Sequence, residues 1–265
     1  MKKYFPTELV IQVFALLIAF IVIHAYYVAV IRPNADAFLA EQHAQMKIDP
    51  NFVPQRSYYV VVRDYEQEAC FVLMFWALAI LTFKGWVALR QQRQLEWDFI
   101  GLPKNANITV ETARDISKRI REEVPINMQE YLLPSILLSA SDRFAMTQSI
   151  QDASMVVHDM CESEAERSES ELSIIRYIAW AIPSIGFIGT VRGIGNALGQ
   201  AHQAVSGDIT GVTQSLGVAF NSTLIALLIS IVLMFIIHQI QLMQERLVHG
   251  TERYCDNLFI SRLKA

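Results

Sequence analysis

Two threonines in apolar stretches of the chain are the residues best suited to handle an ion. Thr190 belongs to the segment IPSIGFIGTVRGI at 182–194, and Thr223 belongs to AFNSTLIAL at 219–227. A threonine hydroxyl both donates and accepts hydrogen bonds, so a ring of such groups can line a narrow wet path or bind a visiting carboxyl group. The alternative is that each hydroxyl bonds a carbonyl of its own helix, as membrane threonines often do.

The glycines around Thr190 leave one flank of its helix almost free of side chains. Gly186 and Gly189 stand three residues apart, and Gly193 follows four residues later. Another helix can approach such a flank closely, which is how helices associate in lipid. Pro183 lacks a backbone donor, so it can bend the helix or free a carbonyl that a neighbour must satisfy. The three glycines are predicted to pack helices together, a role that would also suit a protein whose glycines serve assembly alone.

The elements that carry these residues are long apolar segments. The chain has 265 residues, of which 53% are hydrophobic and only 18% charged, and this excludes an ordinary soluble domain. A bilayer core requires about 20 mostly apolar residues in a helix. Four segments meet the requirement, at 9–30, 69–89, 174–198 and 212–238. The sequence therefore predicts an all-α polytopic membrane protein with four transmembrane helices.

Basic residues near the ends of the spans indicate the orientation of the chain. Positive side chains precede the first span and follow the second and the fourth: Lys2, Lys3, Arg90, Arg93, Arg246 and Arg253. The short link 199–211 has neither Lys nor Arg, which favours the opposite side. The first span exceeds the 7–15 apolar residues of a signal peptide, so it is predicted to be a retained anchor. Both termini are accordingly expected in the cytoplasm.

This topology divides the chain into six parts. They are a first transmembrane helix at 1–31, a periplasmic loop at 32–68, a second transmembrane helix at 69–89, a cytoplasmic helical insert at 90–173, a channel-like helix pair at 174–238 and a cytoplasmic tail at 239–265. Within the insert, Ala113, Ile116, Ile120 and Val124 recur at helical spacing and predict an amphipathic helix. The stretch 141–173 has neither Pro nor Gly and is expected to lead directly into the third span.

Several classes of function lack support in the composition. The formal net charge is −4, so no basic excess points to nucleic acid as a partner. Cys70, Cys161 and Cys255 lack metal-ligand spacing, and neither a metal site nor a cofactor is expected. The glycine segment 186–193 follows no strand and is not a nucleotide-binding loop. No nucleophile–base pair is evident, so we do not expect an enzyme.

Ionisable residues are scarce where an ion would have to pass. The third and fourth spans have no Asp, Glu or His in their central portions, although proton relays ordinarily use such groups. A proton carrier would therefore have to come from another chain. His24 is expected at the membrane interface beside Tyr26 and Tyr27, and Lys84 is expected to extend its ammonium group toward the inner side.

The segments 182–194 and 219–227 together resemble the MotA/TolQ/ExbB proton channel family. In that family a Pro-x-x-Gly-x-x-Gly-Thr-Val-x-Gly segment precedes a span with a central Ala-Thr pair, and the resemblance covers roughly the last third of this chain. It implies that Thr190 and Thr223 line an ion pathway. It also implies that the helix-packing residues are Pro183, Gly186, Gly189 and Gly193.

The resemblance further implies a pentamer in the bacterial inner membrane. Such pentamers enclose the single spans of a dimeric partner similar to ExbD, TolR or MotB, whose membrane Asp carries the proton, and ion flow drives mechanical work. Two positions depart from the pattern: Arg192 replaces a usual apolar residue and is expected to extend to the outer face, and Ala226 replaces a common glycine. Four spans are typical of the flagellar-stator branch, whereas the Gly-Thr-Val-x-Gly wording is typical of the TolQ/ExbB branch.

Two other functions remain open at this point. One is a non-conducting scaffold, held together by small-residue helix packing. The other is an enzyme or receptor that uses the loop 31–68 as an outer binding domain. The second is disfavoured, because about 38 residues make a marginal independent core.

Overall fold

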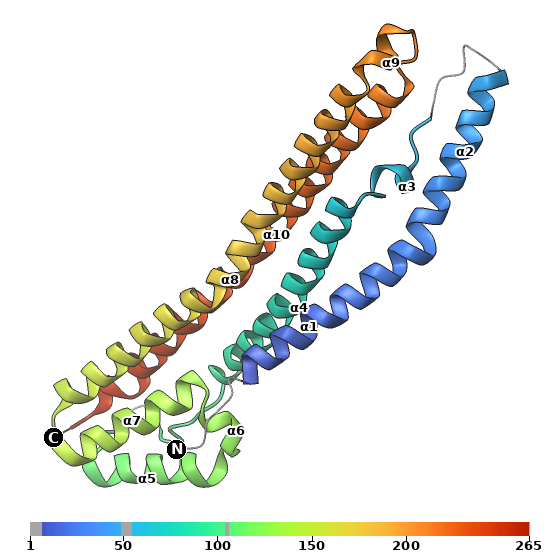
Figure 1. Cartoon of the computed structure of the whole chain (residues 1–265). Helices are drawn as coiled ribbons and strands as arrows, with labels where there is room; N and C mark the ends of the chain where they lie inside the picture. The colour runs from blue at the N-terminus through green and yellow to red at the C-terminus, as the bar shows by residue number, and fades with distance from the viewer. Residues whose placement is uncertain (1–6, 49–54, 104–105, 265) are drawn as a thin grey trace. The chain divides into compact units, whose positions relative to one another are not determined.

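The computed structural model describes residues 7–48, 55–103 and 106–264, and these ranges are almost entirely helical (Figure 1). The elements are α1 (Thr7–Tyr26), a π-helical turn η1 (Tyr27–Ile31), α2 (Arg32–Ile48), α3 (Tyr58–Val61), α4 (Tyr65–Gln94), α5 (Val110–Glu123), α6 (Ile126–Gln129), α7 (Leu132–Thr147), α8 (Ile150–Gly199), α9 (Ala201–Val205), α10 (Thr210–Leu258) and a 3-10 turn η2 (Ile260–Arg262). An isolated β-bridge joins Ile108 and Leu263. The expected all-α class is confirmed for the described residues.

Four helical stretches are long and apolar enough to cross a membrane. They are Val10–Met46, Tyr65–Gln94, Ile150–Gly199 and Thr210–Arg262. Each overlaps one of the four spans expected from hydropathy, so the chain is a multi-pass membrane protein. The orientation of the termini stays a prediction. Lys2 and Lys3, on which it partly rests, lie outside the described residues.

The segment 32–68, expected as a loop, is largely helical in the described residues. After α1 the chain continues through η1 into α2, and α4 begins at Tyr65, four residues before the expected start of the second span. The stretch from Ala35 to Met46 is rich in Ala, Gln, Leu and Met, which are strong helix formers. Pro33 lies in the first turn of α2, directly after the wider π turn, where its missing amide is tolerated.

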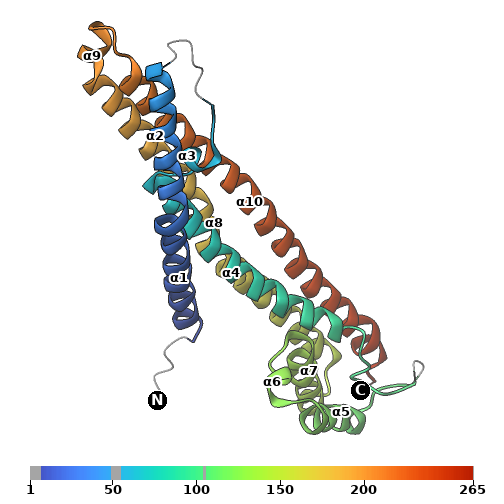
Figure 2. The ribbon, with the colours of Figure 1, turned by 90° about the vertical axis from the view of Figure 1, so that its right-hand side faces the viewer.

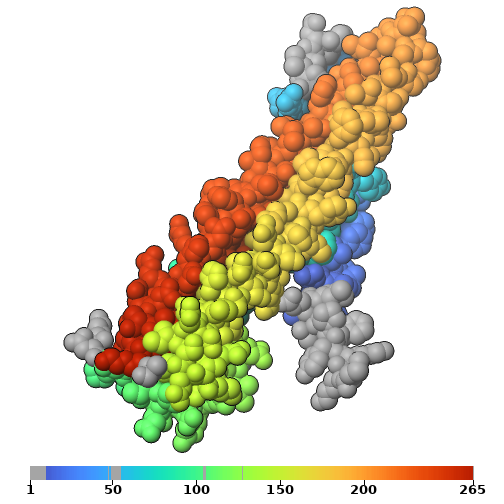
Figure 3. Space-filling view, turned by 90° about the vertical axis from the view of Figure 1, so that its left-hand side faces the viewer, coloured from blue at the N-terminus to red at the C-terminus, as the bar shows by residue number. Residues whose placement is uncertain are grey.

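The chain forms two compact units. Unit 1 consists of Met1–Leu81 and Ile174–Ile237, and unit 2 consists of Thr82–Ser173 and His238–Ala265. Within unit 1, α8 and α10 lie side by side (Figure 3). The elements α2, α3 and α9 lie at the same end of unit 1 (Figure 2). The helices α2 and α3 therefore lie at the same end of unit 1 as the link between α8 and α10.

Unit 2 has a hydrophobic core of its own. The buried apolar side chains of α5 are those predicted from the periodicity, namely Ala113, Ile116 and Ile120, while Val124 is partly buried. They pack with Phe144 of α7 and other apolar residues of α7, α8 and α10. The helix α8 runs from Ile150 to Gly199, so the expectation that one helix leads from the insert directly into the third span is confirmed.

Lys84 forms a buried ion pair in unit 2. Its Nζ lies 2.6 Å from Oε2 of Glu171, and the other oxygen of that carboxylate accepts from Arg167 Nε at 2.9 Å. Only 9% of the Lys84 side chain is exposed. The partner was not expected because Glu171 lies 87 residues away in sequence, and the direction of the ammonium group relative to the membrane stays a prediction.

We expect Lys84→Met to lower the free energy of unfolding of unit 2 by about 2 kcal/mol, because it leaves a partly buried carboxylate with only Arg167 as a cationic partner. The matched control is Lys118→Met, since Lys118 is exposed and lies 3.9 Å from Glu122. Thermal unfolding in detergent should show less than about 0.5 kcal/mol for the control. Equal losses in both variants would contradict the assignment.

The carbonyl group that Pro183 leaves without a donor is satisfied by the neighbouring helix. Pro183 lies inside α8 and has no amide hydrogen to donate to Ala179, four residues earlier. The Ser230 hydroxyl of α10 donates to the Ala179 carbonyl at 3.0 Å. The helix therefore continues through the proline with its freed acceptor paired, as membrane interiors require.

Candidate functional site

The structure brings Thr190 and Thr223 together where α8 and α10 cross. Their hydroxyl groups hydrogen-bond to each other. Each hydroxyl also has a carbonyl acceptor on the opposite helix, Thr190 Oγ1 at 3.0 Å from the Ala219 oxygen and Thr223 Oγ1 at 3.1 Å from the Gly186 oxygen. Because the pair has two protons, two of these three bonds form at any one time. Both threonines are half-buried. The two residues proposed for ion passage thus form one polar group with four oxygen atoms between two apolar helices.

The hydroxyl bonds run mainly between the helices rather than within them. Each hydroxyl has a single proton, and the short carbonyl contact of each threonine is to the opposite helix. The contact of Thr190 with its own helix, at the Gly186 carbonyl, is longer at 3.4 Å. The alternative of bonding back to the same helix therefore does not describe this pair. The threonines join α8 to α10 and keep lone pairs available for a further donor.

The glycines of α8 allow the two helix backbones to touch. A Cβ at Gly186 would lie 2.5 Å from the Ala226 Cβ, and a Cβ at Gly193 would lie 2.7 Å from the Ser215 carbonyl oxygen. Separations below 3.0 Å essentially do not occur for real Cβ atoms. Ala226, where the family commonly has glycine, supplies the methyl group that fills the space over Gly186. Sequence reasoning had not singled out the facing side of α10, which is lined by Ala219, Ser222 and Ala226.

The first turn of α4 lies against this crossing. Gln67 is fully buried, and its Nε2 donates to the Ser222 hydroxyl at 3.3 Å. A Cβ at Gly189 would lie 2.5 Å from the Ser222 Cβ and 3.2 Å from the Glu66 Cγ. Gly189 therefore accommodates both α10 and the Glu66 side chain. The sequence signal for this contact is weak, because the polar residues simply precede an apolar span.

Arg192 forms ion pairs with two carboxylates. Its Nη2 donates to Glu66 Oε2 at 2.8 Å and lies 3.8 Å from Asp64 Oδ1. These two carboxylates near the start of α4 were not expected as partners, and the extension of Arg192 toward the outer face stays a prediction. Arg192 lies two residues after Thr190, and its guanidinium group connects α8 to the beginning of α4.

His24 also has an ionic partner that was not expected. Its Nδ1 lies 2.6 Å from Glu68 Oε1, and Arg32 donates to the other oxygen of that carboxylate. The Glu68 side chain is only 8% exposed. His24 is therefore not simply an interfacial residue beside Tyr26 and Tyr27. Glu66, which contacts Gly189 and Arg192, shows that this chain does bring a carboxylate close to the α8/α10 pair, although those two spans lack acids in their central portions.

Long apolar helices that touch through glycines, with paired hydroxyls between them, define a polytopic helical membrane protein whose core pair suits ion passage or tight packing. Residues 129–253 match the sequence model of the MotA/TolQ/ExbB proton channel family, and this part of the chain belongs to that family. The match includes both threonines and all four predicted packing residues. The family is one of membrane channels rather than of enzymes. No match was found among curated proteins or among solved structures.

Proposed function

We propose that this protein is a subunit of an ion-driven motor channel in a bacterial inner membrane. Five copies surround a dimeric single-span partner similar to ExbD, TolR or MotB, and the partner's membrane Asp carries a proton past Thr190 and Thr223. The observation that supports the proposal is the hydroxyl pair at the glycine-lined crossing of α8 and α10. A channel of this kind needs no cofactor and no metal.

The chemistry of the pair suits a carboxyl group that gains and loses a proton. An ionised carboxylate accepts hydrogen bonds, whereas a protonated carboxyl group donates one. Threonine hydroxyls can serve both states, because each can act as donor or acceptor. The partner's Asp can then bind at this level when charged and leave when neutral. Repeated binding and release around a ring of five such pairs converts ion flow into movement.

The second candidate is a non-conducting scaffold. The hydroxyl groups of Thr190 and Thr223 have acceptors across the crossing, in each other and in the carbonyl groups of the opposite helices. Such bonds, together with the glycine contacts, would hold two helices together without any ion. The scaffold therefore predicts the same contacts in a single chain, and it differs from the channel in its partner and in ion uptake.

Purification from the native membrane distinguishes the two functions. Native mass spectrometry of the complex is expected to show five copies of this chain with two copies of a smaller single-span protein. Vesicles containing that complex should take up protons when a membrane potential is imposed. A complex of this chain alone, or one with its companion that leaves the vesicle pH unchanged, would favour the scaffold.

A further inference from the structure

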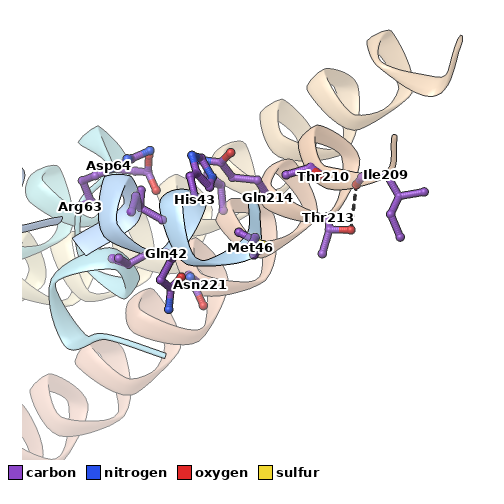
Figure 4. A pocket seen from close by; sticks show the side chains of 14 residues that line it. Gln42, His43, Met46, Arg63, Asp64, Ile209, Thr210, Thr213, Gln214 and Asn221 are labelled. Carbon is purple, nitrogen blue, oxygen red and sulfur yellow. Dashed lines mark hydrogen bonds between the residues drawn. The ribbon is translucent and has the colours of Figure 1, made fainter. Parts of the chain in front are cut away.

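A cavity of about 370 Å³ opens at the end of unit 1 where α2, α3 and the start of α10 meet. Figure 4 shows side chains from these elements, including Gln42, His43 and Asn221, around it. Asp64, which directly precedes α4, lines the same cavity. Its side chain is 13% exposed. This carboxylate is thus mostly buried yet borders a space large enough for several water molecules.

The guanidinium groups near Asp64 make only a long contact with its carboxylate. Its contact with Arg192 is 3.8 Å long, whereas the same guanidinium nitrogen lies 2.8 Å from Glu66. Arg63 forms its own ion pair with Asp36 at 3.2 Å, and Arg32 is bound to the carboxylate of Glu68. The nearby cations are therefore closer to other acids than to Asp64.

Burial raises the pKa of Asp64 above its usual range. The guanidinium groups of Arg63 and Arg192 lower this pKa, the Glu66 carboxylate raises it, and Arg32 lowers it. The balance favours the protonated form more than in an exposed aspartate. This direction agrees with the geometry, in which a mostly buried carboxylate has only a long contact to a cation.

Polar groups lead from Asp64 to the threonine crossing. Arg192 joins Asp64 to Glu66, and the Glu66 side chain lies over Gly189, the residue before Thr190. In the same turn of α4, the Oε1 atom of Gln67 is buried and has no hydrogen-bond partner among the described residues. A buried acceptor of this kind calls for a donor such as a water molecule.

We propose that Asp64 is a proton-exchange site of this chain, placed between the cavity and the crossing of α8 and α10. Its carboxylate takes a proton from a hydronium ion in the cavity, which leaves water, and later returns that proton to a water molecule on the side of the crossing. The return step rests on the proposed channel function, whereas the exchange with the cavity does not.

A purely structural role for Asp64 is to cap α4. The Glu68 amide donates to the Asp64 carbonyl oxygen at 3.1 Å, so Asp64 stands at the N-terminal cap position. Asparagine is as good a cap as aspartate but cannot bind a proton. Asp64→Asn therefore separates the two roles.

Infrared difference spectroscopy of the full-length protein in lipid nanodiscs, titrated with acid, tests the site. The wild type should show a protonated-carboxyl band that Asp64→Asn removes without lowering the unfolding temperature. Arg192→Gln should move the midpoint of this band to higher pH, and Glu66→Gln should move it to lower pH. Both variants break the same 2.8 Å ion pair, so a loosened structure would move the two midpoints in the same direction. Asp208→Asn, on the exposed link, is the control and should leave the band in place.

An unchanged band in Asp64→Asn, or midpoints that move together, would overturn the proton site. That outcome leaves the proposed channel untouched, because the threonine pair is a separate group. Failure of the channel function would appear differently, as a wild-type complex that takes up no protons while the Asp64 band still titrates. If the site holds and the channel conducts, Asp64→Asn should also slow proton uptake into vesicles, and an unaltered rate would overturn the return step.

Discussion

Replacing Thr190 by valine is expected to abolish most ion uptake by the native complex while leaving the complex assembled. Valine keeps the volume of the side chain and removes the hydroxyl that bonds Thr223 and the Ala219 carbonyl. Leaving a buried polar group without its hydrogen-bond partner costs roughly 1–3 kcal/mol of free energy. A change of about 1.4 kcal/mol in an activation free energy changes a rate tenfold. Proton uptake into vesicles should therefore fall roughly 5- to 150-fold, and Thr223→Val should behave in the same way.

Two controls separate this effect from general damage. Thr190→Ser restores a hydroxyl and should recover much of the uptake. Ser184→Ala removes another hydroxyl from α8, one that bonds only the Trp180 carbonyl of its own helix, and should leave uptake unchanged. If Thr190→Val conducts like the wild type, the threonines are structural and the scaffold function gains. If the variant fails to assemble, the hydroxyl serves packing rather than conduction.

The second large effect is expected at the glycine contact between the helices. Gly193→Ala adds a methyl group 2.7 Å from the Ser215 carbonyl oxygen, 2.7 Å from the Ala219 Cβ and 2.8 Å from the Ala219 amide nitrogen. Two of these atoms belong to the backbone of α10, so no side-chain rotation can relieve the overlap. The helices must separate, and we expect the free energy of unfolding to fall by about 3 kcal/mol.

Gly195→Ala is the matched control because it lies on the same helix with nothing within 4 Å of the added methyl group. Alanine is the better helix former by roughly 0.5–1 kcal/mol, so this variant should be slightly more stable than the wild type. Thermal unfolding in detergent should thus show opposite signs for the two substitutions. A similar loss at both positions would attribute the effect to the sequence of α8 itself and not to its close approach to α10.

Much of the helical framework was predictable because it depends on local properties of the sequence. Apolar length predicted the four membrane-crossing helices, and the spacing of Ala113, Ile116 and Ile120 predicted the buried face of α5. Glycine spacing indicated the flank of α8 that another helix would contact. Each of these signals lies within a single segment, so neither a partner nor a distance had to be known. The exception was α2, where the helix formers after Pro33 were read as part of a loop.

The ionic partners were not predictable, because they join residues far apart in the chain. Arg192 and Glu66 are 126 residues apart, and Lys84 and Glu171 are 87 apart. A charged side chain in an apolar segment can extend to the membrane surface, or it can form an ion pair with an opposite charge inside the protein. Hydropathy alone favours the first, and only the packing of α4 against its neighbours reveals the second. For His24 the same reasoning applies to Glu68.

The backbone hydrogen bond that Pro183 cannot form is replaced by a contact between two helices. A proline in a transmembrane helix is often regarded as a flexible point, because one backbone hydrogen bond of the helix is missing there. Here the Ser230 hydroxyl of α10 donates a hydrogen bond to the free Ala179 carbonyl of α8. This bond links the two helices at the position of the missing backbone bond. Bending at the proline would have to break this hydrogen bond inside lipid, where no water could replace it. The Ser230 hydroxyl therefore opposes bending of α8 at Pro183.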